Sequence, residues 1–286
     1  MTAWPGGGKV AVVLNIMLEQ WAEDTAPGLG PMGNPLGGAV HDYQAQSWGR
    51  YGANTGARKL LAVLGARAAA ATFYVSGILA ANQPELVAEI AADGHEIAAH
   101  GWAQNIVPAT LDKDTERAQL QQSIAALRDA CGVPPEGWIS PRCTPSADTA
   151  ELLAEAGLTW FGDVFDADDP YLLETARGSI VALPFGLDVN DLPMMVRYGQ
   201  PARELVDTFE TLLDAAIAED QLTYLDVTVH AHVAGRLIGR RQLDLILNRI
   251  AADNIWVATR QQIAAQFVAN STEPPGKGDS VVGGIR

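Results

Sequence analysis

Apolar residues along the chain form short runs that alternate with longer amphipathic segments. Runs with the length and composition of buried strands lie at 9–15, 70–76, 95–100, 137–140, 158–163, 179–185, 223–230 and 255–260. The segments between them have helical spacing, and several end at glycine, namely 84–94, 114–132, 146–157, 203–220 and 239–254. Buried strands that alternate with helices are typical of a parallel sheet, and this number of them predicts a closed or nearly closed (β/α) barrel.

Reactive side chains cluster where the predicted strands end. In (β/α) barrels the catalytic groups lie at the C-terminal ends of the strands. The side chains found there are Asn15 to Glu19, His100, Ser140 to Arg142, Asp163, Asp188, Asn190, Asp191, His230 and His232. The pattern therefore predicts a single site at which these groups meet.

Two regions depart from the strand–helix alternation. Residues 19–51 are rich in glycine and proline, and they include Trp21, Tyr43, Trp48 and Tyr51. Because loops of this length in compact domains are usually lids or binding loops, we expect an ordered lid that packs over the site. The segment 268–286 is predicted to be a disordered tail, which leaves one domain at 1–267.

Composition excludes several classes of partner. The chain of 286 residues has a formal charge of −15 and a pI near 4.6, which argues against nucleic acid or an anionic membrane as a partner. No apolar stretch reaches membrane-spanning length. Cys131 and Cys143 form no disulfide framework, and the N-terminal apolar run is more typical of a first strand than of a signal peptide. We therefore expect a soluble cytoplasmic protein.

The stretch GHEIAAHGWAQN, residues 94–105, holds two of the five histidines. His95 and His100 do not have the His-x3-His spacing of a zinc helix, and position 104 is glutamine. In a strand they would point to opposite faces, so any partners of His100 must come from elsewhere in the chain. His95 directly follows the glycine that ends a predicted helix, and we expect a structural role for it.

Several blocks resemble one family. ATFYVSGILAANQPELVAEIAADGHEIAAHGW resembles the central block of the polysaccharide-deacetylase superfamily. YGANTGARKLL, SPRCTPSADT, GDVFDADDPY, LDVNDLP and VHAHVAGRLIGR resemble further blocks of its branch of deacetylase-like allantoinases and cyclic-imide hydrolases, over roughly residues 8–267. The resemblance implies an α/β fold, a distorted (β/α) barrel of the deacetylase type with a long N-terminal lid loop. It also implies a hydrolase that forms a homodimer or homotetramer.

The chain departs from that family at the metal-binding positions. Metal-dependent deacetylases carry TFDDG at the end of the first strand, whereas this chain has Asn15 to Leu18 there, with Glu19 as the first acid. Gln104 replaces the second histidine, so only His100 of the Asp-His-His triad is in place. The resemblance therefore favours hydrolysis of a small cyclic amide, imide or ureide. Zinc or another divalent metal, held by Glu19, His100 and His230, remains an open alternative.

The family positions suggest a role for each catalytic candidate. Glu19 or His100 would take the proton from an attacking water, and His230 would stabilise the oxyanion or protonate the leaving nitrogen. The alternative for Glu19 is an exposed loop residue, and for His100 a structural imidazole. The candidates for substrate binding are Arg142, Asn190, Asp191, Trp102, Gln104 and His232.

Two of these candidates have further interpretations. We expect Arg142 to be buried and to bind a carboxylate, either of the substrate or, as a structural salt bridge, of Asp163 or Asp166. Asp191 would orient Arg142 or a substrate N–H. Cys143, next to Arg142, is expected to be a small buried side chain rather than a nucleophile.

Two other functions fit parts of the sequence. A metal-dependent deacetylase of N-acetylated sugars would need the paired Asp motif and the second histidine. A barrel that only binds a ligand would explain the missing triad, but it would not explain His100, Arg142, Asp191 and His230 at the strand ends. The identity of the ring substrate cannot be read from the sequence.

Overall fold

A nine-stranded curled sheet forms the centre of the molecule in the computed structural model, which describes residues 3–22, 25–28, 30–33, 36, 40–253 and 255–271. The strands are β1 (Val10–Leu18), β2 (Thr72–Val75), β3 (Glu96–Ala99), β4 (Gly137–Trp138), β5 (Trp160–Phe161), β6 (Tyr171–Thr175), β7 (Gly178–Ala182), β8 (Thr223–His230) and β9 (Trp256–Ala258). Their order is β6-β7-β5-β4-β3-β2-β1-β8, and β9 pairs with β1. All these pairs are parallel except the β6–β7 hairpin.

The sheet curls into a distorted half-barrel, as expected, although β6 and β8 do not pair to close it. The chain that follows β7 crosses this open side. The amide N–H of Thr228 in β8 donates to the Val189 carbonyl at 2.8 Å, and the amide of Gly186 donates to the Asp226 carboxylate at 2.7 Å. The segment after β7 therefore borders β8 and leads directly to the C-terminal rim of the barrel.

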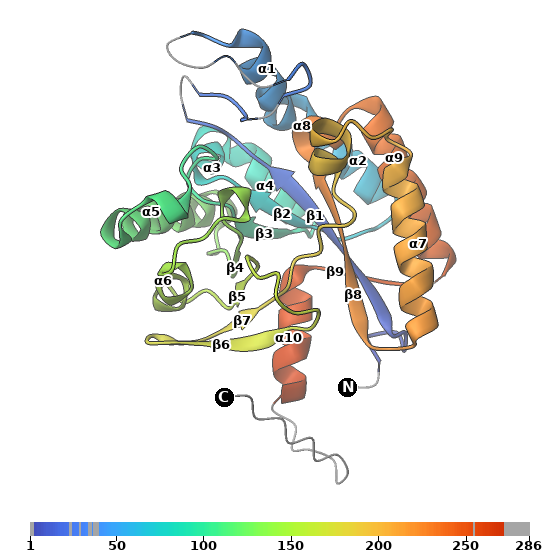
Figure 1. Cartoon of the computed structure of the whole chain (residues 1–286). Coiled ribbons are helices and arrows are strands. Elements are labelled where there is room, and N and C mark those ends of the chain that lie inside the picture. Colours follow the sequence, from blue (N-terminus) through green and yellow to red (C-terminus); the bar gives the residue numbers. More distant parts are fainter. Residues whose placement is uncertain are drawn as a thin grey trace.

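Helices surround the sheet and follow the strands in sequence (Figure 1). They are α1 (Tyr43–Tyr51), α2 (Ala57–Ala66), α3 (Gly77–Asn82), α4 (Pro84–Ala92), α5 (Lys113–Cys131), α6 (Thr149–Glu155), α7 (Glu204–Glu219), α8 (Ala231–Ala234), α9 (Leu237–Ala252) and α10 (Arg260–Ser271). Local chemistry sets their ends. For example, Asp112 caps α5 by accepting from the Thr115 amide, and Gly132 ends it in the left-handed conformation.

The short helical turns are η1 (Gly52–Gly56), η2 (Pro108–Thr110), η3 (Pro141–Cys143) and η4 (Leu192–Arg197). Two of them, η3 and η4, follow β4 and the segment after β7. They therefore lie among the connections at the C-terminal rim, where the predicted site residues are found.

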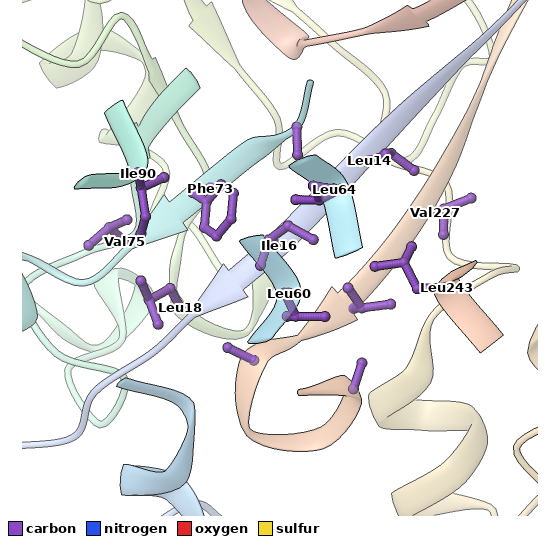
Figure 2. Close-up of a cluster of buried hydrophobic side chains, with 14 of the residues drawn as sticks. Leu14, Ile16, Leu18, Leu60, Leu64, Phe73, Val75, Ile90, Val227 and Leu243 are labelled. Carbon is purple, nitrogen blue, oxygen red and sulfur yellow. The ribbon is translucent and has the colours of Figure 1, made fainter. Parts of the chain in front are cut away.

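The first strand is buried on both faces. Leu14, Ile16 and Leu18 point outward into a cluster with Phe73 of β2 and Leu60 of α2 (Figure 2). The alternate residues of β1 point into the barrel interior. Because burial of each large apolar side chain stabilises the fold by about 1.5–3 kcal/mol, β1 is held firmly in the sheet. Glu19, directly after β1, is thereby fixed at the C-terminal rim.

A buried ion pair lies in the barrel interior. The Arg260 guanidinium, at the start of α10, lies 2.7 Å from the Asp226 carboxylate of β8, and both side chains are almost completely buried. Asn15 donates to Asp226 at 2.8 Å and accepts from the Tyr74 hydroxyl at 3.0 Å. The sequence pattern did not predict this network, which connects α10 with β1, β2 and β8.

Several expectations about the chain differ from the structure. Part of the predicted lid loop 19–51 is the helix α1, which lies beside α8 (Figure 1), while 23–24, 29, 34–35 and 37–39 lie outside the described residues. The helix α10 continues to Ser271, beyond the predicted domain end at 267. Of the predicted tail, 272–286 lie outside the described residues.

No helix in the described part of the chain is long and apolar enough to cross a membrane.

Candidate active site

The three predicted catalytic residues lie at strand ends and belong to one site. The Glu19 Oε1 atom is 3.5 Å from Nε2 of His100, which follows β3. Its Oε2 atom is 3.7 Å from Nδ1 of His232 in α8, and the ring of His232 lies 5.7 Å from that of His230 at the end of β8. The carboxylate of Glu19 therefore lies between two imidazoles, with His230 as a close neighbour.

The backbone fixes the orientation of the His100 ring. Its Nδ1 atom is 2.9 Å from the Ile139 carbonyl, and because a carbonyl only accepts, Nδ1 carries a hydrogen. Nε2 then faces the Glu19 carboxylate. A lone pair on Nε2 would repel the Glu19 carboxylate. The contact between His100 and Glu19 is therefore attractive when a proton lies between Nε2 and the carboxylate.

The environment of Glu19 keeps its carboxylate ionised. Burial alone would raise its pKa, but the hydrogen bond from His100 and the neighbouring histidine charges lower the pKa to about 2. The main chain after it is also held, because the Gln20 amide donates to the Ser76 hydroxyl at 3.1 Å. Glu19 is therefore an ionised and positioned carboxylate at neutral pH, rather than an exposed loop residue.

Asp191 positions His230. The carboxylate of Asp191, directly before η4, accepts from Nδ1 of His230 at 2.7 Å and from the His230 backbone amide at 3.0 Å. Burial lowers the pKa of His230, but the charge and hydrogen bonds of Asp191 outweigh this effect and raise it. The expectation that Asp191 would orient Arg142 is therefore wrong, because Asp191 is buried and both of its oxygens already bind His230.

His232 connects the lid to Glu19. Its ring meets Trp48 edge-on at 4.5 Å and Trp21 at 5.7 Å, and both tryptophans belong to the predicted lid. Its Nδ1 is buried without a hydrogen-bond partner among the described residues. Burial lowers the pKa of His232 to about 4, so the ring is neutral at neutral pH. A neutral ring with an unpaired nitrogen therefore lies beside Glu19, and its binding of substrate stays a prediction.

Arg142 does not have the expected environment. Its side chain is exposed, and it makes no ion pair with Asp163 or Asp166 or with any other described residue. Arg142 and Cys143 both have left-handed backbone conformations, with φ of 59° and 51°. Such strain at non-glycine residues costs about 1–3 kcal/mol each and occurs often at functional sites. The prediction of a buried, salt-bridged Arg142 is therefore wrong, and its binding of substrate stays a prediction.

The remaining predicted binding residues differ in how far contacts within the protein already engage their side chains. Gln104 donates to the Ser76 hydroxyl at 3.1 Å and to the His100 carbonyl at 3.0 Å, and these two internal hydrogen bonds stabilise the site. The Oδ1 atom of Asn190 accepts from the Leu192 amide at 3.2 Å. The half-buried ring of Trp102 packs against Gly77, where an added Cβ would lie 2.8 Å from it. Gln104 is therefore structural, and the contributions of Asn190 and Trp102 stay predictions.

Sequence reasoning assigned no role of its own to Asp163, which follows β5. Both of its oxygens accept from the Ser140 amide, at 3.0 and 2.8 Å, and burial raises its pKa to about 7. Its place at the end of a predicted strand was the available signal. Cys143 lies nearby, and burial raises its thiol pKa well above the usual value, which agrees with the expectation that it is not a nucleophile.

The residues of the site do not fit a metal centre. Among the described residues, no three His, Cys, Asp or Glu side chains form a group that could hold a metal ion. Gln104, at the position of the second family histidine, donates its amide N–H groups to Ser76 and to a carbonyl. An amide that is engaged in this way is a poor substitute for an imidazole ligand. Glu19, His100 and His230 are therefore not assigned as metal ligands.

Comparisons with known proteins agree with this architecture. The model of the family "Polysaccharide deacetylase" matches residues 49–161, which include His100 but neither Glu19 nor His230. A Schizosaccharomyces pombe protein named "Putative polysaccharide deacetylase" is 23% identical over 306 aligned residues, covering 93% of this chain and 92% of its own.

Two solved structures are similar over almost their whole length. The crystal structure of a probable polysaccharide deacetylase from Pseudomonas aeruginosa PAO1 matches with a TM-score of 0.86 and 24% identity, over 95% of each chain. That of Puue allantoinase matches with a TM-score of 0.87 and 22% identity, over 95% of this chain and 94% of the other. At this level of identity the similarity establishes a shared fold.

Proposed function

We propose that the chain is a member of the polysaccharide deacetylase superfamily and that it hydrolyses the C–N bond of a small cyclic amide, imide or ureide. The observation that carries the proposal is the ionised carboxylate of Glu19, held between His100 and His232 at distances of 3.5 and 3.7 Å. Glu19 is the first acid after the positions at which the family's metal-dependent members carry TFDDG, and its carboxylate can accept a proton from water directly.

The chemistry follows from the protonation states of the site. Glu19 removes a proton from a water molecule, and the resulting hydroxide attacks the ring carbonyl carbon. The carbonyl oxygen becomes an oxyanion. Asp191 raises the pKa of His230, which favours the cationic imidazolium, and this form can donate a hydrogen bond to that oxyanion or a proton to the ring nitrogen. The C–N bond then breaks with its electron pair on nitrogen, and the ring opens to a carboxylic acid and an amine, amide or urea for a cyclic amide, imide or ureide.

The enclosure of the site favours a small substrate over a polymer. The Glu19 side chain is only 9% exposed, and the side chains of His100 and His232 are even less exposed. Trp21 and Trp48 of the lid lie against His232. A polysaccharide chain needs an open groove, whereas a ring of five or six atoms can be held under a lid. The fold shared with the solved allantoinase also supports this substrate class.

Hydrolysis of a small panel of rings tests the proposal. Succinimide, glutarimide, dihydrouracil, hydantoin and allantoin are offered beside an acetylated chitooligosaccharide, before and after chelation of metals. We expect at least one ring to be opened, and the rate to survive chelation.

Substitution tests the role of Glu19 in the same assay. Glu19→Gln should lower kcat by roughly 10²–10⁴-fold, the usual contribution of a general base. Glu85→Gln, at an exposed position of α4, is the matched control and should leave the rate unchanged. Release of acetate from the oligosaccharide with every ring inert would refute the proposal.

A further inference from the structure

A cyclic amide or imide brings an N–H group as well as a carbonyl into the site. A buried N–H needs an acceptor, because leaving it unpaired costs about 1–3 kcal/mol. The predicted acceptor Asp191 is already engaged, since it binds His230. Among the other groups at the rim, the carboxyl group of Asp163 is a suitable acceptor for the ring N–H.

Asp163 has unused acceptor capacity. A carboxylate offers about four lone-pair positions, and the donors to Asp163 in the described part of the chain both belong to one residue, the amide and the hydroxyl of Ser140. The residue is only 7% exposed. A buried carboxyl whose donors come from a single residue can take a further N–H donor without losing contact with the protein.

A single peptide group links Asp163 to the catalytic residues. The carbonyl of Ile139 accepts from Nδ1 of His100, and the amide of Ser140, in the same peptide group, donates to Asp163. His100 and Asp163 therefore flank the end of β4 on its two sides. A small ring bound in front of this strand end can meet both residues.

We infer that Asp163 accepts the ring N–H of the substrate and so selects rings whose nitrogen next to the attacked carbonyl carries a hydrogen. The inference rests on the proposed function and narrows its substrate class to unsubstituted cyclic amides, imides and ureides. An N-methylated ring lacks the donor and places a methyl group against the carboxylate. A site built to bind an N–H rejects such an analogue strongly, and we expect a discrimination of at least about 100-fold.

The experiment compares succinimide with N-methylsuccinimide on the wild-type protein and on Asp163→Asn. In the variant the Asn oxygen can still accept from Ser140, but the amide N–H groups then face the ring N–H. We expect kcat/KM for succinimide to fall at least tenfold, and the preference for succinimide over its N-methyl analogue to collapse. A purely structural role would lower both rates together and preserve the ratio. Asp168→Asn, exposed in the same connection, is the matched control.

Binding of both rings, measured by ligand-observed NMR, separates this inference from the proposed function. Ring opening with an N–H preference that survives in Asp163→Asn would overturn the role of Asp163 and leave the hydrolase proposal intact. Selective binding of succinimide that is lost in the variant, without any turnover, would support the role of Asp163 and refute hydrolysis of this ring. Wild-type protein that neither binds nor discriminates these rings would overturn the inference.

Discussion

Replacing Asp191 with asparagine tests how the protein raises the pKa of His230. Asp191 is fully buried, and it accepts from the His230 ring at 2.7 Å and from the backbone amide at 3.0 Å. Asparagine preserves the shape and one acceptor oxygen but removes the negative charge. Burial then acts alone on the His230 ring, and burial lowers a histidine pKa.

The size of the effect follows from that one interaction. A hydrogen bond to a charged partner contributes about 1.5–3 kcal/mol, and one pKa unit corresponds to about 1.36 kcal/mol. Asp191→Asn should therefore lower the pKa of His230 by about 1–2 units, from above its usual 6.5 to below it. Since a raised histidine pKa stabilises the fold below pH 6.5 and this gain is lost as the pH rises through the folded pKa, the stability difference between wild type and variant should shrink at alkaline pH.

NMR titration of the five histidines measures the shift without any substrate, with His230→Gln to assign the resonance. In the wild type the His230 signal should titrate above pH 6.5, and in the variant below it. If ring opening is found, the alkaline limb of its pH profile should move in the same direction. Asp188→Asn, exposed on the same segment, is the control. An unchanged or higher pKa in the Asp191→Asn variant would show that Asp191 does not set the charge of His230.

Three other substitutions have expected outcomes. Asp226→Asn leaves the buried Arg260 guanidinium without its partner at 2.7 Å and should lower the free energy of unfolding by about 3–5 kcal/mol, measured by denaturant titration; a variant as stable as the wild type would contradict this. Cys143→Ala should keep ring-opening activity within a few-fold, because burial keeps the thiol protonated, and a loss above 100-fold would assign the thiol a chemical role. Gly101→Ala would place a side chain at a φ of 67°, with its Cβ 2.5 Å from the Pro141 ring. It should therefore destabilise the fold by about 1–3 kcal/mol and lower the Tm. An unchanged Tm would mean that the Pro141 turn moves freely.

The strands that are buried on both faces could be predicted well from the sequence. β1 and β8 were recognisable as continuous apolar runs because both of their faces lie inside the protein. The hairpin β6–β7 was not predicted as two paired strands. Its first strand has partly exposed residues, including the charged Glu174, and it follows a stretch that is typical of a turn. A solvated edge hairpin gives a weaker apolar pattern than a buried parallel strand.

The proximity of the candidate residues could be predicted, whereas their individual partners could not. The ends of parallel strands meet at one rim, and the structure brings Glu19, His100 and His230 together there. Which carboxylate meets which imidazole depends on side-chain direction, and the sequence does not give it. Arg142 is the clearest case, since its left-handed backbone, which no local residue pattern predicted, goes with an exposed side chain.

The peptide group between Ile139 and Ser140 has a consequence for how this site can vary among proteins. Because it holds His100 and Asp163 through main-chain atoms, either flanking side chain can change without releasing them. The peptide group between residues 139 and 140 makes these bonds with main-chain atoms, so it leaves no characteristic residue in an alignment. Only proline at position 140 would remove its N–H. If Asp163 has the role that we infer, substrate preference can diverge through this residue alone while His100 keeps its orientation. A survey of related chains should look at the residue after the fifth strand before it looks at the motif histidines.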